Sequence, residues 1–120
     1  MPKVMLVEDD SNMLSMLQML LQFEGYQVVA PEAGVGAEAV IKLIQHEKPA
    51  LLFLDVHLGR FSGFDLLCIL RQDPHLVGMR ILMASGMDLS YKCRQQGADG
   101  FIMKPFMPDE LIGEIQKILQ

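Results

Sequence analysis

The stretch LLFLDVHLG, residues 51–59, decides the fold that we expect for this chain. Its first four residues form an unbroken apolar run of strand length, which is typical of a strand buried on both faces of a parallel sheet. The run ends on Asp55, and a carboxylate at the edge of a core costs free energy unless a neighbouring group compensates its charge. The remaining sequence should therefore supply a partner for Asp55.

Four other apolar runs have the length of a strand: KVMLV at 3–7, QVVA at 27–30, RILMA at 80–84 and GFIM at 100–103. The segments between the runs have helical periodicity. We expect one helix from a cap at Ser11 to Gly25, one that stops before Pro49, one that stops before Pro74 and a last one opened by Pro108. The segment 88–96 is a fifth candidate and has the weakest helical pattern.

Strands that alternate with helices predict an α/β fold, in which right-handed crossovers join parallel strands and helices cover both faces of the sheet. The chain has 120 residues, of which 51% are hydrophobic and 21% are charged, so it can bury a core of its own. No linker or repeat divides it. We therefore expect a single domain over residues 1–120, which could be excised from a longer protein.

Composition argues against several classes of function. The formal net charge is -5 and the basic residues are scattered singly, so no basic stripe is present for direct nucleic-acid binding. No apolar run reaches the roughly 18 residues of a membrane-spanning helix and the N-terminus lacks the features of a signal peptide, so we expect a cytoplasmic protein without membrane contact. We expect Cys68 and Cys93 to be reduced, buried thiols and the ten methionines to fill the core.

Polar residues follow four of the five expected strands. In an open parallel sheet, ligands bind beyond the carboxyl ends of the strands, so these residues should meet in one crevice. They are Glu8, Asp9 and Asp10 after the first run, Asp55 after the third, Ser85 after the fourth and Lys104 after the fifth.

Carboxylates that converge on one crevice repel each other unless a cation intervenes, and hard oxygen ligands favour Mg2+. Lys104 would hold Asp55 ionised and neutralise an oxygen of an incoming phosphoryl group, while the Ser85 hydroxyl donates a hydrogen bond to another. An ionised aspartate beside a divalent cation is a nucleophile for phosphoryl transfer, so these residues predict an aspartyl phosphate at Asp55.

Each element also has a simpler interpretation. An acidic run before a helix is more often a helix cap than a metal site, and Asp55 alone is about as often a loop cap as a reactive group. Ser85 alone would be a turn residue and Lys104 alone a solvated surface lysine. The chemical interpretation is favoured because four strand ends would have to carry compatible groups to one crevice by accident.

The chain resembles the response-regulator receiver domains of bacterial two-component signalling, the CheY-like family. The resemblance covers essentially the whole length, through MLVEDD, LLFLDVHLGRFSG, ILMASG and GADGFIMKPF in that order. It implies a flavodoxin-like (βα)5 three-layer sandwich with strand order 2-1-3-4-5. It also implies a phosphorelay switch that takes a phosphoryl group from a sensor histidine kinase or a histidine phosphotransfer protein and alters a protein-interaction face, without turnover of an outside substrate.

By this resemblance Asp55 is the phosphoacceptor, and Glu8 and Asp9 are the acidic pair that binds Mg2+, with Mn2+ as an alternative ion. Asp55 and the main-chain carbonyl of His57 complete the implied protein ligands, whereas Asp10 is the least favoured ligand of the acidic run. We expect the His57 imidazole to be solvated rather than bound to metal.

The resemblance further implies that Ser85 is the switch hydroxyl and Phe101 the aromatic switch residue, whose side chain reorients when Ser85 moves toward the phosphoryl group. Lys104 pairs with the phosphoryl group, and the Lys104–Pro105 bond would be cis.

Three departures from the family pattern stand out. Gly59 occupies a position where the family usually has proline, which should loosen the loop after Asp55. Gly86 follows Ser85 where alanine is common. The segment 85–97 is about one helical turn shorter than usual and begins poorly as a helix, which leaves the family's usual output face and its phosphorylation-dependent homodimer as weaker expectations.

Two rival functions remain open from the sequence. A receiver-like module could bind proteins without being phosphorylated, but its mark would be loss of Asp55, of the acidic pair or of Lys104, and none is lost. A phosphatase of the haloacid dehalogenase type would have an acidic partner two residues after its nucleophile, where this chain has His57.

Overall fold

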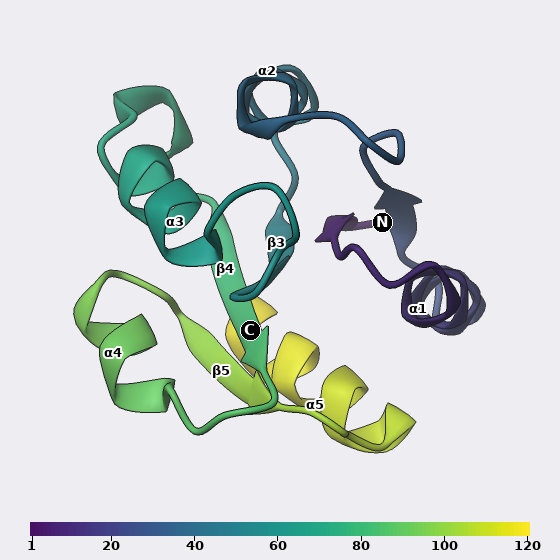
Figure 1. The fold of residues 1–120 in the computed structure, drawn as a ribbon. Helices are drawn as coiled ribbons and strands as arrows, with labels where there is room; N and C mark the ends of the chain where they lie inside the picture. The colour runs from purple at the N-terminus through teal and green to yellow at the C-terminus, as the bar shows by residue number, and fades with distance from the viewer.

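Five parallel strands form one sheet in the order β2-β1-β3-β4-β5, as predicted (Figure 1). The computed structural model describes all 120 residues. The strands are β1 (Lys3–Val7), β2 (Gln27–Val29), β3 (Leu51–Asp55), β4 (Arg80–Ser85) and β5 (Gly100–Met103). In the sheet register, Asp55 pairs with Ala84 and Ser85 pairs with Met103. The register therefore carries the ends of β3, β4 and β5 to one edge.

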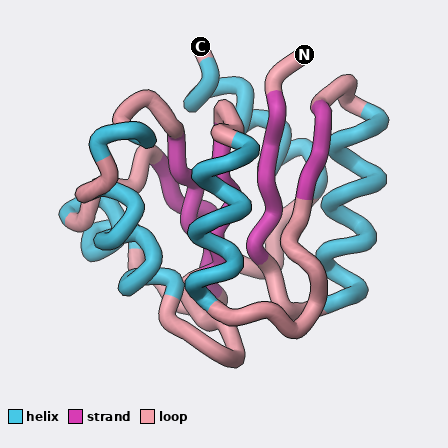
Figure 2. Tube along the Cα trace, turned by 90° about the horizontal axis from the view of Figure 1, so that it is seen from above, coloured by secondary structure: helices cyan, strands magenta, loops and turns pink.

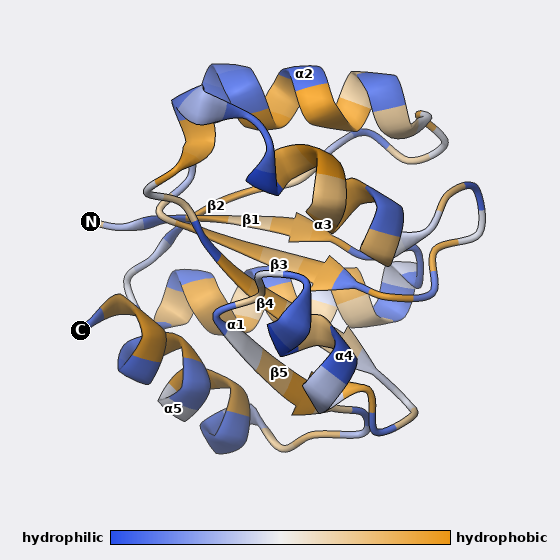
Figure 3. Ribbon diagram, turned by 90° about the vertical axis from the view of Figure 1, so that its left-hand side faces the viewer, coloured by the Kyte–Doolittle hydropathy of each residue, from blue (hydrophilic) through white to orange (hydrophobic).

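Helices cover both faces of this sheet, and each face has its own buried cluster (Figure 3). The helices are α1 (Ser11–Phe23), α2 (Ala37–Glu47), α3 (Gly63–Arg71), α4 (Ser90–Gln95) and α5 (Pro108–Leu119), with a short 3-10 helix at Pro74–Leu76. Side chains of α2, α3 and α4 pack on one face, and side chains of α1 and α5 pack on the other. Burial on both faces accounts for the unbroken apolar runs of the central strands.

Both termini lie at one edge of the sheet, opposite the loops that follow the carboxyl ends of the strands (Figure 2). Those loops carry the polar residues of interest. None of the helices combines the length and the apolar character needed to cross a bilayer.

The start of α1 differs by one residue from the prediction. Asp10, not Ser11, is the cap, because the Asp10 carboxylate accepts a hydrogen bond from the Met13 amide at 3.0 Å. Asp10 therefore stabilises the free amides of the first turn of α1. This role agrees with its low rank among the predicted metal ligands.

The α4 helix has only six residues and no side-chain cap, as its weak sequence pattern indicated. Arg71, at the end of α3, stabilises the turn that follows α4. Its guanidinium donates to the carbonyl oxygens of Gly97 and Met79, both at 2.8 Å, and to the Asp99 carboxylate at 2.7 Å. Hydrogen bonds from another helix thus stabilise the region that α4 is too short to order by itself.

Two predictions about sulfur-containing residues were wrong. Cys93 is buried, but Cys68 lies on the exposed side of α3. Six of the ten methionines are exposed rather than in the core: Met1, Met16, Met19, Met87, Met103 and Met107. On α1 the inward positions are taken by Leu17 and Leu21, whereas Met16 and Met19 lie on the exposed side of the helix.

Candidate functional site

Lys104, directly after β5, lies between two buried carboxylates. Its Nζ is 2.5 Å from Glu8 Oε1 and 3.1 Å from Asp55 Oδ2. The side chains of Glu8 and Asp55 are 2% and 8% exposed, so little water screens these ion pairs. The partner that the sequence required for Asp55 is therefore the Lys104 ammonium.

These contacts shift the proton affinities of the site. Burial raises the pKa of Asp55 above its ordinary value, and repulsion from Glu8 raises it further, while the attraction of Lys104 opposes both effects. Burial alone would lower the pKa of Lys104, but its contacts with Glu8 and Asp55 more than compensate and raise it. Lys104 is thus held in its charged form between the two acids.

Ser85 ends β4 at the same edge of the sheet and is fully buried. Its hydroxyl accepts a hydrogen bond from the Met87 amide at 3.1 Å, and its carbonyl accepts one from the Lys104 amide at 2.8 Å. The Lys104–Pro105 bond is cis, which confirms the expectation from the resemblance. Ser85 and Lys104 are therefore joined through the main chain of neighbouring strands.

The amino end of α3 packs against the carboxyl end of β3. A Cβ atom on Gly63 would lie 2.2 Å from the main-chain oxygen of Asp55 and 2.8 Å from Val56 Cα, so only glycine fits at this crossing. The Ser62 hydroxyl caps α3 by accepting from the Phe64 amide at 3.1 Å. Asp55 is thus fixed from behind by a helix end.

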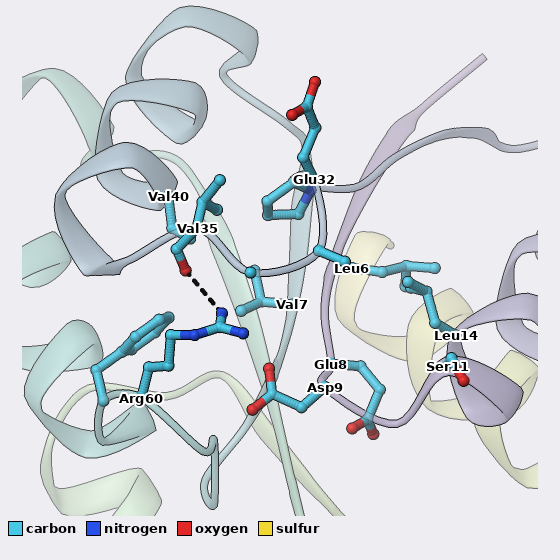
Figure 4. A pocket seen from close by; sticks show the side chains of 14 residues that line it. Leu6, Val7, Glu8, Asp9, Ser11, Leu14, Glu32, Val35, Val40 and Arg60 are labelled. Carbon is cyan, nitrogen blue, oxygen red and sulfur yellow. Dashed lines mark hydrogen bonds between the residues drawn. The ribbon is translucent and has the colours of Figure 1, made fainter.

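Glu8 and Asp9 extend in different directions from the end of β1 (Figure 4). Glu8 contacts Lys104, whereas Asp9 is exposed and its Oδ2 accepts a hydrogen bond from the main-chain amide of Gly59. No group of three or more His, Cys, Asp or Glu side chains is arranged to hold a metal ion. The predicted acidic residues share one edge of the sheet but do not form a coordination shell.

The donor chemistry nevertheless fits Mg2+. Glu8, Asp9 and Asp55 supply hard carboxylate oxygens, and the main chain of His57 adds a carbonyl within the loop that follows Asp55. The His57 amide donates to Asp55 Oδ1 at 3.4 Å, and the imidazole is exposed, as expected. Glu8, Asp9, Asp55 and the His57 carbonyl are thus the groups at this edge of the sheet that would hold the ion.

A cavity of about 210 Å³ lies beside Asp9, between β1, α1 and the loops that follow β2 and β3 (Figure 4). Arg60 spans it and donates to the carbonyl oxygen of Val35 at 3.2 Å. Sequence reasoning missed both Arg60 and the Gly59 amide. A main-chain donor has no signature in a sequence, and the contact of Arg60 joins loops that are distant along the chain.

Phe101 lies in β5 opposite Met83 of β4 and is partly buried against the cluster under α3 and α4. Met87, two residues after Ser85, is 59% exposed. Phe101 therefore lies on the strand next to the one that Ser85 ends, and the Met87 side chain largely faces solvent.

Comparisons with known proteins agree on one family. A family model described as the response regulator receiver domain matches residues 4–116. The transcriptional regulatory protein CpxR of Escherichia coli (strain K12) is 36% identical over 121 residues, which cover all of this chain and 50% of CpxR. PhoP of Bacillus subtilis (strain 168), an alkaline phosphatase synthesis transcriptional regulatory protein, is 30% identical over 98% of this chain and 48% of its own length. The chain therefore spans about half the length of the curated relatives it matches.

Solved structures give the same result. A protein of Chloroflexus aurantiacus J-10-fl, assigned as a response regulator, superposes with a TM-score of 0.89 at 29% identity and covers 98% of this chain and 97% of its own. The chemotaxis response regulator CheY4 of Vibrio cholerae superposes with a TM-score of 0.89 at 24% identity over 99% of both chains, which supports the fold alone.

Proposed function

The chain belongs to the response regulator receiver domain family, and on that basis we propose that it accepts a phosphoryl group on Asp55 from the phosphohistidine of a sensor kinase or a histidine phosphotransfer protein. The transfer takes place in the cytoplasm and modifies only the chain itself.

The observation that carries this proposal is the position of Lys104 between Glu8 and Asp55. A buried aspartate held against an ammonium at the carboxyl end of a parallel sheet has a nucleophilic oxygen and a counter-ion for transferred negative charge. The fully buried Ser85 hydroxyl lies at the end of the neighbouring strand.

In the proposed reaction, a carboxylate oxygen of Asp55 attacks the phosphorus of the donor. The new oxygen–phosphorus bond forms as the nitrogen–phosphorus bond breaks, and the imidazole leaves with its electron pair and is protonated. Lys104 and Ser85 bind oxygens of the transferred group, so the added charge is neutralised at fixed positions. Glu8, Asp9, Asp55 and the His57 carbonyl would hold Mg2+, which supplies charge neutralisation when bound.

The switch follows from the charge that this reaction adds. A phosphoryl group on Asp55 accepts a hydrogen bond from the Ser85 hydroxyl and draws the hydroxyl toward it. This movement takes the hydroxyl oxygen away from the Met87 amide, from which it now accepts a hydrogen bond. Phe101, which partly fills the space under α4, then takes a second orientation, and the surface of α4, β5 and α5 changes. Phosphorylation changes the populations of conformations that already exist in the unphosphorylated chain.

The partners are protein partners in this scheme. CpxR and PhoP are named as transcriptional regulatory proteins, and this chain matches half of each. We propose that it acts likewise as the regulatory half of a larger system, without touching nucleic acid itself, and that its output is exerted through a separate domain, a separate protein or a phosphorylation-dependent homodimer.

The test is intact-mass measurement after incubation with acetyl phosphate. Wild type with Mg2+ should gain one phosphoryl adduct, and Asp55→Asn or wild type with a chelator should gain none. An adduct that persists in Asp55→Asn would place the chemistry elsewhere. Absence of any adduct in folded wild type that binds Mg2+ would favour a protein-binding module that works without phosphorylation.

A further inference from the structure

The loop after β3 engages one of the proposed metal ligands through its main chain. The Gly59 amide donates a hydrogen bond to Asp9 Oδ2, and a Cβ on residue 59 would lie 3.1 Å from that oxygen. Proline has no amide hydrogen, so the usual family residue at this position could not make the contact. The departure at Gly59 therefore adds a specific bond where looseness alone was expected.

The same loop is anchored on both sides of Gly59. The His57 amide donates to Asp55 Oδ1, and Arg60 reaches the Val35 carbonyl in the loop after β2. Gly59 thus lies in a segment that connects the ends of β1, β2 and β3. In this arrangement the Asp9 carboxylate contacts the loop after β3, whereas Glu8 and Asp55 both contact Lys104.

A cation and the Gly59 amide make incompatible demands on Asp9. The carboxylates of Glu8 and Asp9 point apart (Figure 4), and no three acidic groups surround a common point. For Asp9 to join Glu8 and Asp55 around Mg2+, its side chain must rotate, and rotation breaks its hydrogen bond to Gly59. The loop after β3 then loses its hydrogen bond to the residue that follows β1.

We propose that the Gly59 amide is a positioning group that holds Asp9 away from the metal site, so that Mg2+ and the loop after β3 compete for one carboxylate. We call the Gly59–Asp9 contact the latch. Closing the latch weakens Mg2+ binding, and binding Mg2+ opens the latch and frees the segment next to Asp55. This inference rests on the proposed function only in assigning Mg2+ to Glu8, Asp9 and Asp55.

The test is calorimetric titration of the metal-free chain with MgCl2, without a phosphodonor. Gly59→Pro removes the amide hydrogen, and Gly59→Ala is its matched control because it adds a Cβ but keeps the donor. Gly59 is not among the glycines with positive φ, so neither substitution forces a side chain into left-handed backbone. If Gly59→Pro does not fold, a main-chain ester at residue 59 removes the same hydrogen without a side chain.

We expect Gly59→Pro to bind Mg2+ about threefold to tenfold more tightly than Gly59→Ala, which carries the same Cβ, and the ester to bind Mg2+ more tightly than wild type by the same factor. This is the factor for losing a competing hydrogen bond to a partly solvated carboxylate. In wild type, saturation with Mg2+ should speed hydrogen exchange of the Gly59 amide by about threefold or more.

Equal Mg2+ affinity in all forms, or an unchanged exchange rate at Gly59, would overturn the latch while leaving phosphoryl transfer to Asp55 intact. Failure of every folded form to bind Mg2+ would overturn the metal site on which both proposals depend. The Asp55-dependent mass adduct, measured in parallel, separates these results.

Discussion

Replacing Lys104 by methionine tests the ion cluster most directly. Methionine keeps a flexible side chain of similar length but leaves Glu8 and Asp55 facing each other without a cation. Because Lys104 contacts both carboxylates and all three side chains are largely buried, one change removes two ion pairs at once.

The cost can be worked from burial. Removing one member of a fully buried ion pair costs about 3–5 kcal/mol, and the 21% exposure of Lys104 reduces this to about 2–4 kcal/mol in metal-free buffer at pH 7.5. With a urea slope of about 2 kcal/mol per molar, the unfolding midpoint should fall by about 1–2 M. This is a large part of the stability of a domain of this size.

The sign of the pH dependence follows from Asp55. Without Lys104 nothing opposes burial and Glu8, so the pKa of Asp55 in the folded state rises further above its unfolded value. The folded state then holds a proton that the unfolded state has lost, and stability falls as pH rises from about 4, the unfolded pKa, through the folded pKa. The deficit of Lys104→Met should therefore be smaller at pH 5 than at pH 7.5.

Urea unfolding followed by circular dichroism at both pH values, with a chelator present, measures the deficit. Lys104→Arg retains the cation in a bulkier side chain and should lose less stability than Lys104→Met. Lys117→Met removes an exposed lysine of α5 and should stay close to wild type. A deficit that is the same at both pH values, or a variant as stable as wild type, would refute the argument that Lys104 neutralises the buried acids.

Two further changes test contacts that hold the fold together away from the site. Arg71→Met should lower the free energy of unfolding, measured in urea, by about 2–3 kcal/mol and speed amide exchange in α4. The reason is that it removes three hydrogen bonds, two of them to main-chain oxygens. If Arg71→Met lowers the free energy of unfolding no more than Asp99→Asn does, only the ion pair matters. The hydrogen bond from Lys3 to Glu47, 2.9 Å long, lowers the pKa of Glu47. Glu47→Gln should therefore be less stable than wild type at pH 7, and this difference should vanish as pH falls from about 4.3, the unfolded value, through the lower folded pKa; a difference that persists at pH 2.5 would contradict this assignment.

The parts of the fold that follow from local pattern could be predicted. An unbroken apolar run such as Leu51–Leu54 has few options except a strand buried on both faces, and the order of runs and helices restricts the topology. The approach of Lys104 to Asp55 could also be predicted, because the carboxyl ends of parallel strands share an edge. These inferences need only the periodicity of apolar residues along the sequence and the parallel direction of the strands.

Orientation of individual side chains could not be predicted in the same way. Asp9 and Asp10 are neighbours with the same chemistry, yet one turns to Gly59 and the other caps α1. The expectation that methionines fill the core failed at Met16 and Met19 of α1, because it rested on their apolar character and not on their place in the helical period, which Leu17 and Leu21 follow inward. The outcome depends on tertiary neighbours that lie far away in the chain.

Gly63 has a consequence for how mutational maps of this chain are interpreted. Any side chain at this position meets the main chain of Asp55 and Val56, so every substitution has to move the peptide that carries the proposed phosphoacceptor. A saturation screen for activity would score Gly63 as intolerant as Asp55 itself, although Gly63 contributes no functional group. Intolerance to substitution at such a position reflects the short distance between a helix and a strand. If it were interpreted as a chemical role, Gly63 would be counted wrongly among the residues that take part in phosphoryl transfer.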